Sequence, residues 1–174
     1  MLTQYKLIST SSARFQMVPI KKEHADLVLN LFNTKGWLEF IGDRNIHSLK
    51  DAEVFIQNAE INPNACLWII SLNDNLAKHI GLVTLIKRDY LNYPDIGYAL
   101  MPNFMGKGIA FEAVKSILNA IIETNEFNQL FAITLPQNFS SLKLLDRLQF
   151  KFEKEIIDKN ELLHLYKLDI AIIK

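Results

Sequence analysis

The chain has 174 residues, of which 49% are hydrophobic and 22% are charged, a balance typical of a folded globular protein and unlike that of a disordered chain. Lys and Arg together number 19, and so do Asp and Glu, so the chain lacks the excess of positive charge with which proteins bind nucleic acids. Cys66 is the only cysteine, which excludes an internal disulfide, and no stretch reaches the roughly 18 apolar residues of a membrane span.

The sequence predicts one domain that spans residues 1–174. Gly and Pro are scattered at single turns, and no long linker, internal repeat or low-complexity segment marks a boundary. Residues 1–10 lack the continuous apolar core of a signal peptide, so we expect a cytoplasmic protein with no membrane contact. The apolar neighbours of Cys66 indicate a buried thiol on a strand.

The first third of the chain predicts one strand followed by two helices. Residues 14–19 are typical of a short strand, and apolar residues between 27 and 32 recur at helical spacing until the turn residues 33–36. Ser48, with Asp51 three residues later, resembles a helix-capping pair. The helix that this pair opens is expected to end at residues 62–64.

Three strands and the most strongly patterned helix follow. Residues 66–72, 80–87 and 95–101 are short, rich in β-branched and aromatic side chains, and separated by turn signals, which predicts an antiparallel meander. The helix after them keeps the i, i+3, i+4, i+7 pattern over three turns through Ala110, Ala113, Val114, Ile117, Leu118 and Ile121.

The last quarter of the chain adds a strand, a helix and a hairpin. A strand at residues 130–135 precedes a helix that Asn138 caps and that runs through residue 148. Residues 150–157 and 162–169 then pair around the turn 158–160. The order βααβββαβαββ predicts an α+β fold with a central mixed, mostly antiparallel β-sheet of about seven strands and with four helices.

The segment most informative about chemistry runs from the strand at residues 95–101 through a glycine loop into the strongest helix. A Walker phosphate loop requires Ser or Thr after its lysine, but Lys107 is followed by Gly108, and a dinucleotide fingerprint requires a third glycine where Phe111 stands. Gly106 and Gly108 allow a tight turn that leaves the first amides of a helix free for an anionic group such as a pyrophosphate. Alternatively, the two glycines only join a strand to a helix.

The segment Met105 to Ala110, Met-Gly-Lys-Gly-Ile-Ala, resembles the acetyl-CoA signature of the GNAT superfamily, whose core pattern is Gln/Arg-x-x-Gly-x-Gly/Ala at the start of a helix. Met105 replaces the usual polar first residue, a change that leaves the backbone contacts of the signature in place. The chain is also similar to the branch that includes the RimJ- and RimL-type ribosomal-protein N-acetyltransferases. This likeness covers nearly the whole chain and rests on residues 14–26, 40–46, 96–100, 106–108 and 112–113, on Asn138-x-x-Ser141 and on Phe150, with Gln149 where the branch has a glycine.

The resemblance implies acetyl-CoA as the co-substrate and a sheet whose fourth and fifth strands splay apart. The pantetheine arm would lie in this gap, oriented by Asn138, against the backbone of Tyr98, Ala99 and Leu100. The pyrophosphate would bind the backbone amides of Met105, Gly106, Lys107, Gly108, Ile109, Ala110 and Phe111. The side chain of Lys107 would add one weak charge there, or it is an ordinary exposed loop lysine.

The resemblance further implies that the chain transfers an acetyl group to a primary amine, on a peptide or protein N-terminus or on a small molecule, by direct attack of the amine on the thioester. An N-terminal amine with a pKa near 8 is roughly one tenth neutral at pH 7, whereas a lysine amine is neutral about once in a few thousand, so only the lysine needs strong help from a base. The alternative is a non-catalytic acyl-CoA-binding sensor or partner module, because Leu145 stands where many GNAT enzymes carry a tyrosine that protonates the thiolate. Members of this branch often pair through their C-terminal strands, so a homodimer is one expectation.

Ser141 and Asp95 are the candidate catalytic residues. Ser141 can donate a hydrogen bond to the departing thiolate, unless Asn138 only caps the helix and the serine hydroxyl bonds to backbone. Asp95 opens the fourth strand, where several GNAT enzymes carry a carboxylate, and a water relay can link it to the amine; otherwise it is a solvated aspartate at a strand edge. Glu112 is expected to fix the glycine loop through a hydrogen bond.

The amine acceptor is expected beside the first interhelix loop, where Trp37, Phe40, Asp43 and Arg44 combine aromatic surface with charge. In the alternative interpretation, Asp43 and Arg44 pair with each other and stabilise a loop over a small aromatic core.

No metal is expected. The four histidines show no metal-ligand spacing with one another or with Cys66. His24 is interpreted as an exposed helix residue and His164 as a structural residue of the hairpin.

Overall fold

A single sheet forms the centre of the molecule. The computed structural model describes residues 1–74, 78–158 and 160–170, and in this part of the chain eight strands follow the order β1-β2-β3-β4-β5-β6-β8-β7. The strands are β1 (Thr10–Ser11), β2 (Phe15–Pro19), β3 (Ala65–Leu72), β4 (His79–Ile86), β5 (Asp95–Leu100), β6 (Gln129–Thr134), β7 (Lys151–Asp158) and β8 (Glu161–Asp169). The helices are α1 (Ala25–Phe32), α2 (Lys35–Phe40), α3 (Leu49–Ile61), α4 (Ile109–Glu123) and α5 (Phe139–Arg147), with 3-10 turns η1 (Thr3–Leu7), η2 (Lys22–His24) and η3 (Pro102–Phe104).

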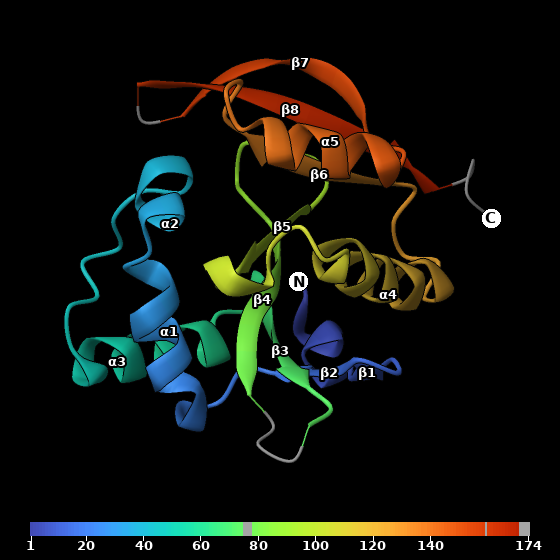
Figure 1. Cartoon of the computed structure of the whole chain (residues 1–174). Coiled ribbons are helices and arrows are strands. Elements are labelled where there is room, and N and C mark those ends of the chain that lie inside the picture. The colour runs from blue at the N-terminus through green and yellow to red at the C-terminus, as the bar shows by residue number, and fades with distance from the viewer. Residues whose placement is uncertain (75–77, 159, 171–174) are drawn as a thin grey trace.

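Helices lie on both sides of the sheet (Figure 1). α1, α2 and α3 occupy one side and α4 occupies the other, while α5 lies beside β6 and β8. On the first side, Val28 of α1 and Ile56 of α3 are buried in one cluster with Leu82 of β4. The predicted fold class, α+β with a mostly antiparallel sheet, is therefore confirmed.

The helix signals in the sequence correspond to real capping contacts. Ser48 Oγ accepts a hydrogen bond from Asp51 N at 3.2 Å, and Asp51 Oδ2 accepts one from His47 N at 3.1 Å, which caps α3 as predicted. Asn138 Oδ1 accepts from Ser141 N at 3.1 Å and caps α5 in the same way.

Two features of the first third differ from the prediction. Residues 35–40 form helix α2 rather than a loop, because Thr34 Oγ1 accepts from Trp37 N at 3.3 Å and caps a short turn in which Gly36 is tolerated. The sheet has eight strands rather than seven, since Thr10 and Ser11 pair with β2 as an edge strand. Neither change alters the arrangement of the other elements.

His24 is buried rather than exposed. Its side chain is 3% exposed, its Nδ1 accepts from Lys21 N at 2.8 Å, and its ring meets that of His79 edge-on with centroids 4.7 Å apart. Burial, followed by the neighbouring His79, lowers the pKa of His24, so the neutral ring is part of the fold.

The antiparallel meander β3-β4-β5 is confirmed, and β5 then diverges from β6. β5 pairs with β4 along its whole length, from Asp95 to Leu100. Between β5 and β6, both fully described, the only register pair is Asp95 with Phe131, and the parallel strands separate beyond it. β5 and β6 are the fourth and fifth strands of the order predicted from the sequence, so the predicted splay is confirmed, and it leaves one backbone edge of β5 open.

The closing hairpin is also confirmed, with β7 antiparallel to β8. Lys159, in its predicted turn, lies outside the described residues. Gln149 adopts φ 68°, the left-handed conformation that favours glycine, so the turn before Phe150 is kept despite the substitution.

Cys66 is buried on β3, as predicted. Its Sγ donates to Leu2 O at 3.1 Å, and burial raises the pKa of the thiol to about 11. No helix in the described part of the chain is long and apolar enough to cross a membrane.

Candidate functional site

The glycine loop lies where β5 ends and α4 begins. Gly106 and Gly108 have φ values of 72° and 76°, which residues with a side chain rarely adopt. Gly108 is the N-cap of α4, and the first backbone bond of the helix runs from Glu112 N to Gly108 O at 3.1 Å. The amides of Ile109 to Phe111 therefore have no partner within the helix and are available to an anion.

Arg14 holds this loop against the helix. Arg14 directly precedes β2. Its Nη1 donates a hydrogen bond to Lys107 O, and its Nε donates one to Glu112 Oε2, both at 2.9 Å. Hydrogen bonds from Ser12 and then from Arg14 lower the pKa of the Glu112 carboxyl, so the group is ionised and paired. Glu112 thus fixes the loop as expected, but it does so through an arginine that sequence reasoning had not singled out.

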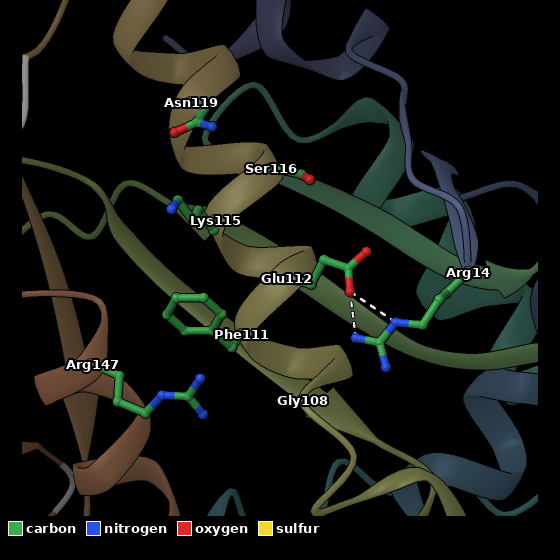
Figure 2. Close-up of a pocket in the computed structure, with 8 residues that line it drawn as sticks. All are labelled: Arg14, Gly108, Phe111, Glu112, Lys115, Ser116, Asn119 and Arg147. Atoms are coloured by element: carbon green, nitrogen blue, oxygen red, sulfur yellow. Dashed lines mark hydrogen bonds and ion pairs between the residues drawn. The ribbon is translucent and has the colours of Figure 1, made fainter.

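A cavity of about 390 Å³ runs along the outer face of α4. Figure 2 shows its lining residues, which are Arg14, Gly108, Phe111, Glu112, Lys115, Ser116, Asn119 and Arg147. The guanidinium of Arg147 from α5 lies 4.4 Å from the centre of the Phe111 ring, and Lys115 Nζ lies 5.8 Å from it. Beside the Arg14–Glu112 pair, the cavity therefore offers two cations, Lys115 and Arg147, and one aromatic face, an environment suited to a large anion with a planar group.

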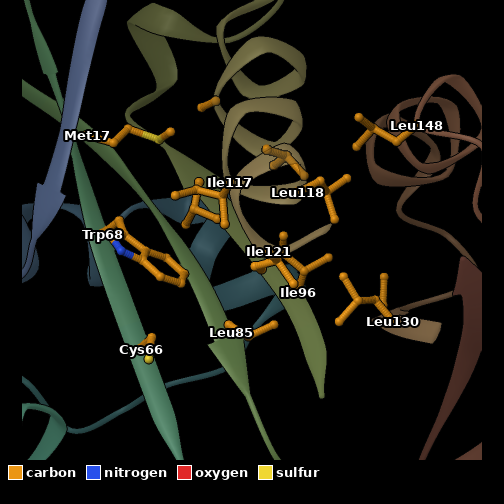
Figure 3. Close-up of a cluster of buried hydrophobic side chains, with 14 of the residues drawn as sticks. Met17, Cys66, Trp68, Leu85, Ile96, Ile117, Leu118, Ile121, Leu130 and Leu148 are labelled. Atoms are coloured by element: carbon orange, nitrogen blue, oxygen red, sulfur yellow. The ribbon is translucent and has the colours of Figure 1, made fainter. Parts of the chain in front are cut away.

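The opposite face of α4 anchors the helix to the sheet (Figure 3). Ile117 and Ile121 are buried in one cluster with Ile96 of β5, Leu130 of β6 and Trp68 of β3. Because this inner face is closely packed, the position of the loop amides relative to β5 is set by the core.

A pair of hydroxyls lies at the mouth of the splay, the opening where β5 and β6 have separated. Tyr98 Oη on β5 lies 2.9 Å from Ser141 Oγ and 3.4 Å from Ser141 O in the first turn of α5. Burial raises the pKa of Tyr98 to about 12, so the phenol is protonated at neutral pH. Sequence reasoning had assigned only backbone contacts to Tyr98, and no local pattern in the sequence links it to Ser141.

The other predicted cofactor residues divide between the two faces of β5. Ala99 packs against the cluster beneath α1 and α3, whereas Leu100 is buried on the α4 side. Met105 and Lys107 are exposed in the loop, and Lys107 Nζ lies 5.5 Å from the centre of the Phe104 ring.

Asp95 is buried rather than solvated. Its side chain accepts from Arg88 Nε at 2.6 Å and from Arg88 Nη2 at 3.3 Å, and the residue is 4% exposed. Burial raises the pKa of Asp95, while the bonds from Arg88 act in the opposite direction. Both carboxylate oxygens are thus engaged, and Arg88 also lies 3.8 Å from Asp158 of β7.

The residues predicted to contact the acceptor differ in their exposure to solvent. Trp37 is 7% exposed, stacks on Phe32 with ring centroids 3.7 Å apart, and donates from Nε1 to Gly42 O at 3.1 Å. Phe40 is half-buried at the end of α2. Trp37 therefore belongs to an aromatic core, as the alternative interpretation held.

Asp43 and Arg44 are both exposed in the loop that follows α2. Asp43 Oδ1 accepts from Asn45 N at 2.7 Å, and the ion pairs among the described residues do not include one between Asp43 and Arg44. The loop is stabilised by this turn contact rather than by the expected ion pair.

A metal site is not present among the described residues, where no three His, Cys, Asp or Glu side chains cluster.

Known proteins with similar sequences include acetyltransferases. The family described as an acetyltransferase (GNAT) domain matches residues 14–151. A curated relative, the uncharacterized N-acetyltransferase p20 of Bacillus licheniformis, is 39% identical over 59 residues, which are 34% of this chain and 33% of the relative. The match thus spans about a third of the length of that relative.

Several solved structures share the fold. The ribosomal-protein-S5-alanine acetyltransferase of Vibrio fischeri superposes with a TM-score of 0.78 at 22% identity, over 96% of this chain and 99% of the other. The RimL ribosomal L7/L12 alpha-N-protein acetyltransferase in complex with coenzyme A gives 0.79 at 15% identity, over 92% and 96%. The microcin C7 self-immunity acetyltransferase MccE, bound to acetyl-CoA and AMP, gives 0.77 at 19% identity, over 91% and 93%.

Proposed function

The chain belongs to the GNAT acetyltransferase family, and from this premise we propose that it transfers an acetyl group from acetyl-CoA to the primary amine of a peptide or protein N-terminus. The observation that carries the proposal is the loop of Gly106 and Gly108, whose left-handed turns present free helix amides at the mouth of the β5–β6 splay. A pyrophosphate there would meet several N–H donors at the positive end of α4.

The rest of the cofactor has a matching surface on each side of this loop. The nucleotide end would follow the cavity along α4, where Lys115, Arg147 and the ring of Phe111 provide charge and a stacking face. The pantetheine arm would enter the splay and bond to the open backbone edge from Tyr98 to Leu100, as an added strand does. Asn138 supports this arm indirectly, because its side chain already caps α5.

In the reaction, the neutral amine attacks the thioester carbonyl, a C–N bond forms, and the C–S bond breaks with its electron pair passing to sulfur. The surplus proton of the amine leaves to water, and the thiolate takes up one proton to give coenzyme A. Ser141 Oγ would donate a hydrogen bond to the developing thiolate, whose ordinary pKa near 8.5 makes modest help sufficient.

The state of Asp95 supports an N-terminal acceptor. A lysine or polyamine amine is mostly protonated at neutral pH and needs a base, but both oxygens of Asp95 are held by Arg88. A water relay from Asp95 would require that ion pair to open. An N-terminal amine is roughly one tenth neutral at pH 7 and reacts without that step.

Release of free thiol from acetyl-CoA tests the proposal directly. We expect thiol release with peptides that have a free N-terminus, and much slower release with the same peptides after N-terminal blocking or with polyamines. Binding of acetyl-CoA, measured by calorimetry, without thiol release from any amine would instead support a non-catalytic acyl-CoA sensor. Absence of both binding and release would contradict the proposal altogether.

Ser141→Ala is expected to lower kcat by at least about tenfold and to change the affinity for acetyl-CoA little, because the hydrogen bond to sulfur strengthens only as the thiolate forms. Steady-state kinetics with a peptide acceptor provide the measurement. Ser140→Ala is the matched control, since Ser140 is an exposed serine in the same helical turn. If Ser141→Ala retained the wild-type kcat, the serine would not be the donor.

A further inference from the structure

We infer that Tyr98 is a positioning residue that aims the hydroxyl proton of Ser141 at the sulfur of acetyl-CoA, an inference that rests on the proposed function. The two residues are 43 positions apart and come from a strand and a helix, yet their hydroxyl oxygens are 2.9 Å apart across the mouth of the splay. Tyr98 would act through Ser141 without touching the reacting atoms.

A hydrogen bond between two hydroxyls can run in either direction, and the inferred direction is from Tyr98 to Ser141. Tyr98 has one hydroxyl proton and two acceptors within reach, Ser141 Oγ at 2.9 Å and Ser141 O at 3.4 Å. The shorter contact has the length of an ordinary O–H···O bond, whereas the longer one is too long for a strong bond. In the inferred arrangement Tyr98 donates to Ser141 Oγ, the nearer acceptor, which leaves the proton of Ser141 free to point into the splay.

The surroundings keep both hydroxyls in these roles. Because burial raises the pKa of Tyr98 to about 12, the phenol remains a donor throughout the neutral range. Ser141 N is bound to Asn138 Oδ1 at 3.1 Å, which fixes the backbone from which the serine hydroxyl projects. A serine hydroxyl without such a partner can instead turn back to a carbonyl one helical turn earlier.

The pair also accounts for Leu145. This residue is 1% exposed in the main hydrophobic cluster, and its side chain carries no hydroxyl. Tyr98 brings a phenol to the same helix from the strand side, next to Ser141. A protein without a tyrosine at position 145 thus still has a phenol hydroxyl hydrogen-bonded to its thiolate donor.

During transfer, Tyr98 would keep its own proton. As the C–S bond breaks and negative charge develops on sulfur, Ser141 donates its hydrogen bond to sulfur, and the bond from Tyr98 to Ser141 Oγ polarises the serine O–H. No proton moves from Tyr98, so the balance of the reaction is unchanged. The effect belongs to the transition state, in which the charge on sulfur is largest.

The test is a double-mutant cycle on steady-state kinetics with a free N-terminal peptide. Tyr98→Phe removes only the hydroxyl and is expected to lower kcat about tenfold while KM for acetyl-CoA changes less than about twofold. In the variant that combines Ser141→Ala with Tyr98→Phe, we expect kcat no lower than in Ser141→Ala alone, because Tyr98 acts through the serine. A role in packing alone would lower the melting temperature and leave kcat unchanged.

Tyr5→Phe is the matched control. Tyr5 is a buried tyrosine whose hydroxyl also bonds at 2.9 Å, to Thr124 Oγ1 at the far end of α4, so its loss should affect stability and leave kcat unchanged. Wild-type kcat in Tyr98→Phe, or losses that multiply in the double variant, would overturn the positioning role while the proposed function stands. Wild-type protein that releases no thiol with any amine would overturn both.

Discussion

Gly108→Val is expected to weaken acetyl-CoA binding by roughly 10- to 100-fold. This loss corresponds to the free-energy cost of forcing a residue into a sparsely populated backbone region. Gly108 has φ 76°, and a Cβ at this position would meet nothing nearer than Arg14 Nη2 at 3.8 Å. Steric crowding is therefore not the cause of the expected loss of affinity. A β-branched residue would relax the turn in the free protein, and the ligand would have to restore the strained turn in order to reach the helix amides.

Titration calorimetry, supported by the rise in melting temperature with acetyl-CoA, measures this effect. Ligand that binds only the folded state raises the melting temperature by mass action, so the variant should show a smaller rise at the same concentration. Gly36→Val is the control for inserting valine at a glycine, because Gly36 lies away from the loop in α2 and has no atom within 4 Å of its added Cβ. Unchanged affinity in Gly108→Val would show that the pyrophosphate does not bind at this loop.

Gly81→Val is expected to have the largest effect on the fold itself, a loss of at least about 3 kcal/mol in the free energy of unfolding or a failure to accumulate as folded protein. Gly81 lies on β4 opposite Leu100 of β5. A Cβ there would overlap the carbonyl oxygen of Ala99 and lie 2.6 Å from Leu100 Cδ2 and 3.1 Å from Leu100 Cα. Because two of these atoms belong to backbone, β4 and β5 would have to move apart.

Urea unfolding followed by circular dichroism measures the change in stability. Gly36→Ala is the matched control, since an alanine in helix α2 meets open space and is expected to change stability by about 1 kcal/mol or less, in the stabilising direction. If Gly81→Ala and Gly81→Val both unfolded at the wild-type midpoint, the close approach of β4 and β5 at this position would be wrong. Intermediate loss in Gly81→Ala is expected, because alanine already supplies the overlapping Cβ.

Local patterns predicted most of the architecture. The apolar spacing of α4 predicted that Ile117 and Ile121 face the sheet, and both are buried there. The pair Ser48 and Asp51 predicted a helix start that the structure confirms. These features depend on residues three or four apart, whose side chains lie on one face of a helix whatever surrounds it.

The errors arose where packing overrode a local signal. Gly36 and its polar neighbours indicated a loop, but stacking of Trp37 on Phe32 stabilises a short helix there. His24 carries a polar ring at a helix start, and it is buried with its ring edge-on to that of His79 on β4. Such burial depends on elements that are distant in the chain, so periodicity within a segment cannot report it.

By itself, the sequence determined most of the strands and helices, the glycine loop, and the chemical identities of the residues near it. The tertiary structure alone decided their partners: Tyr98 meets Ser141 across 43 positions, Arg14 meets Glu112 across 98, and Arg88 closes over Asp95. Local conformation follows from neighbouring side chains and backbone torsions, which the sequence states directly. Each of these contacts exists only because the packing of α4, α5 and the strands on a shared core brings together segments that no local pattern connects.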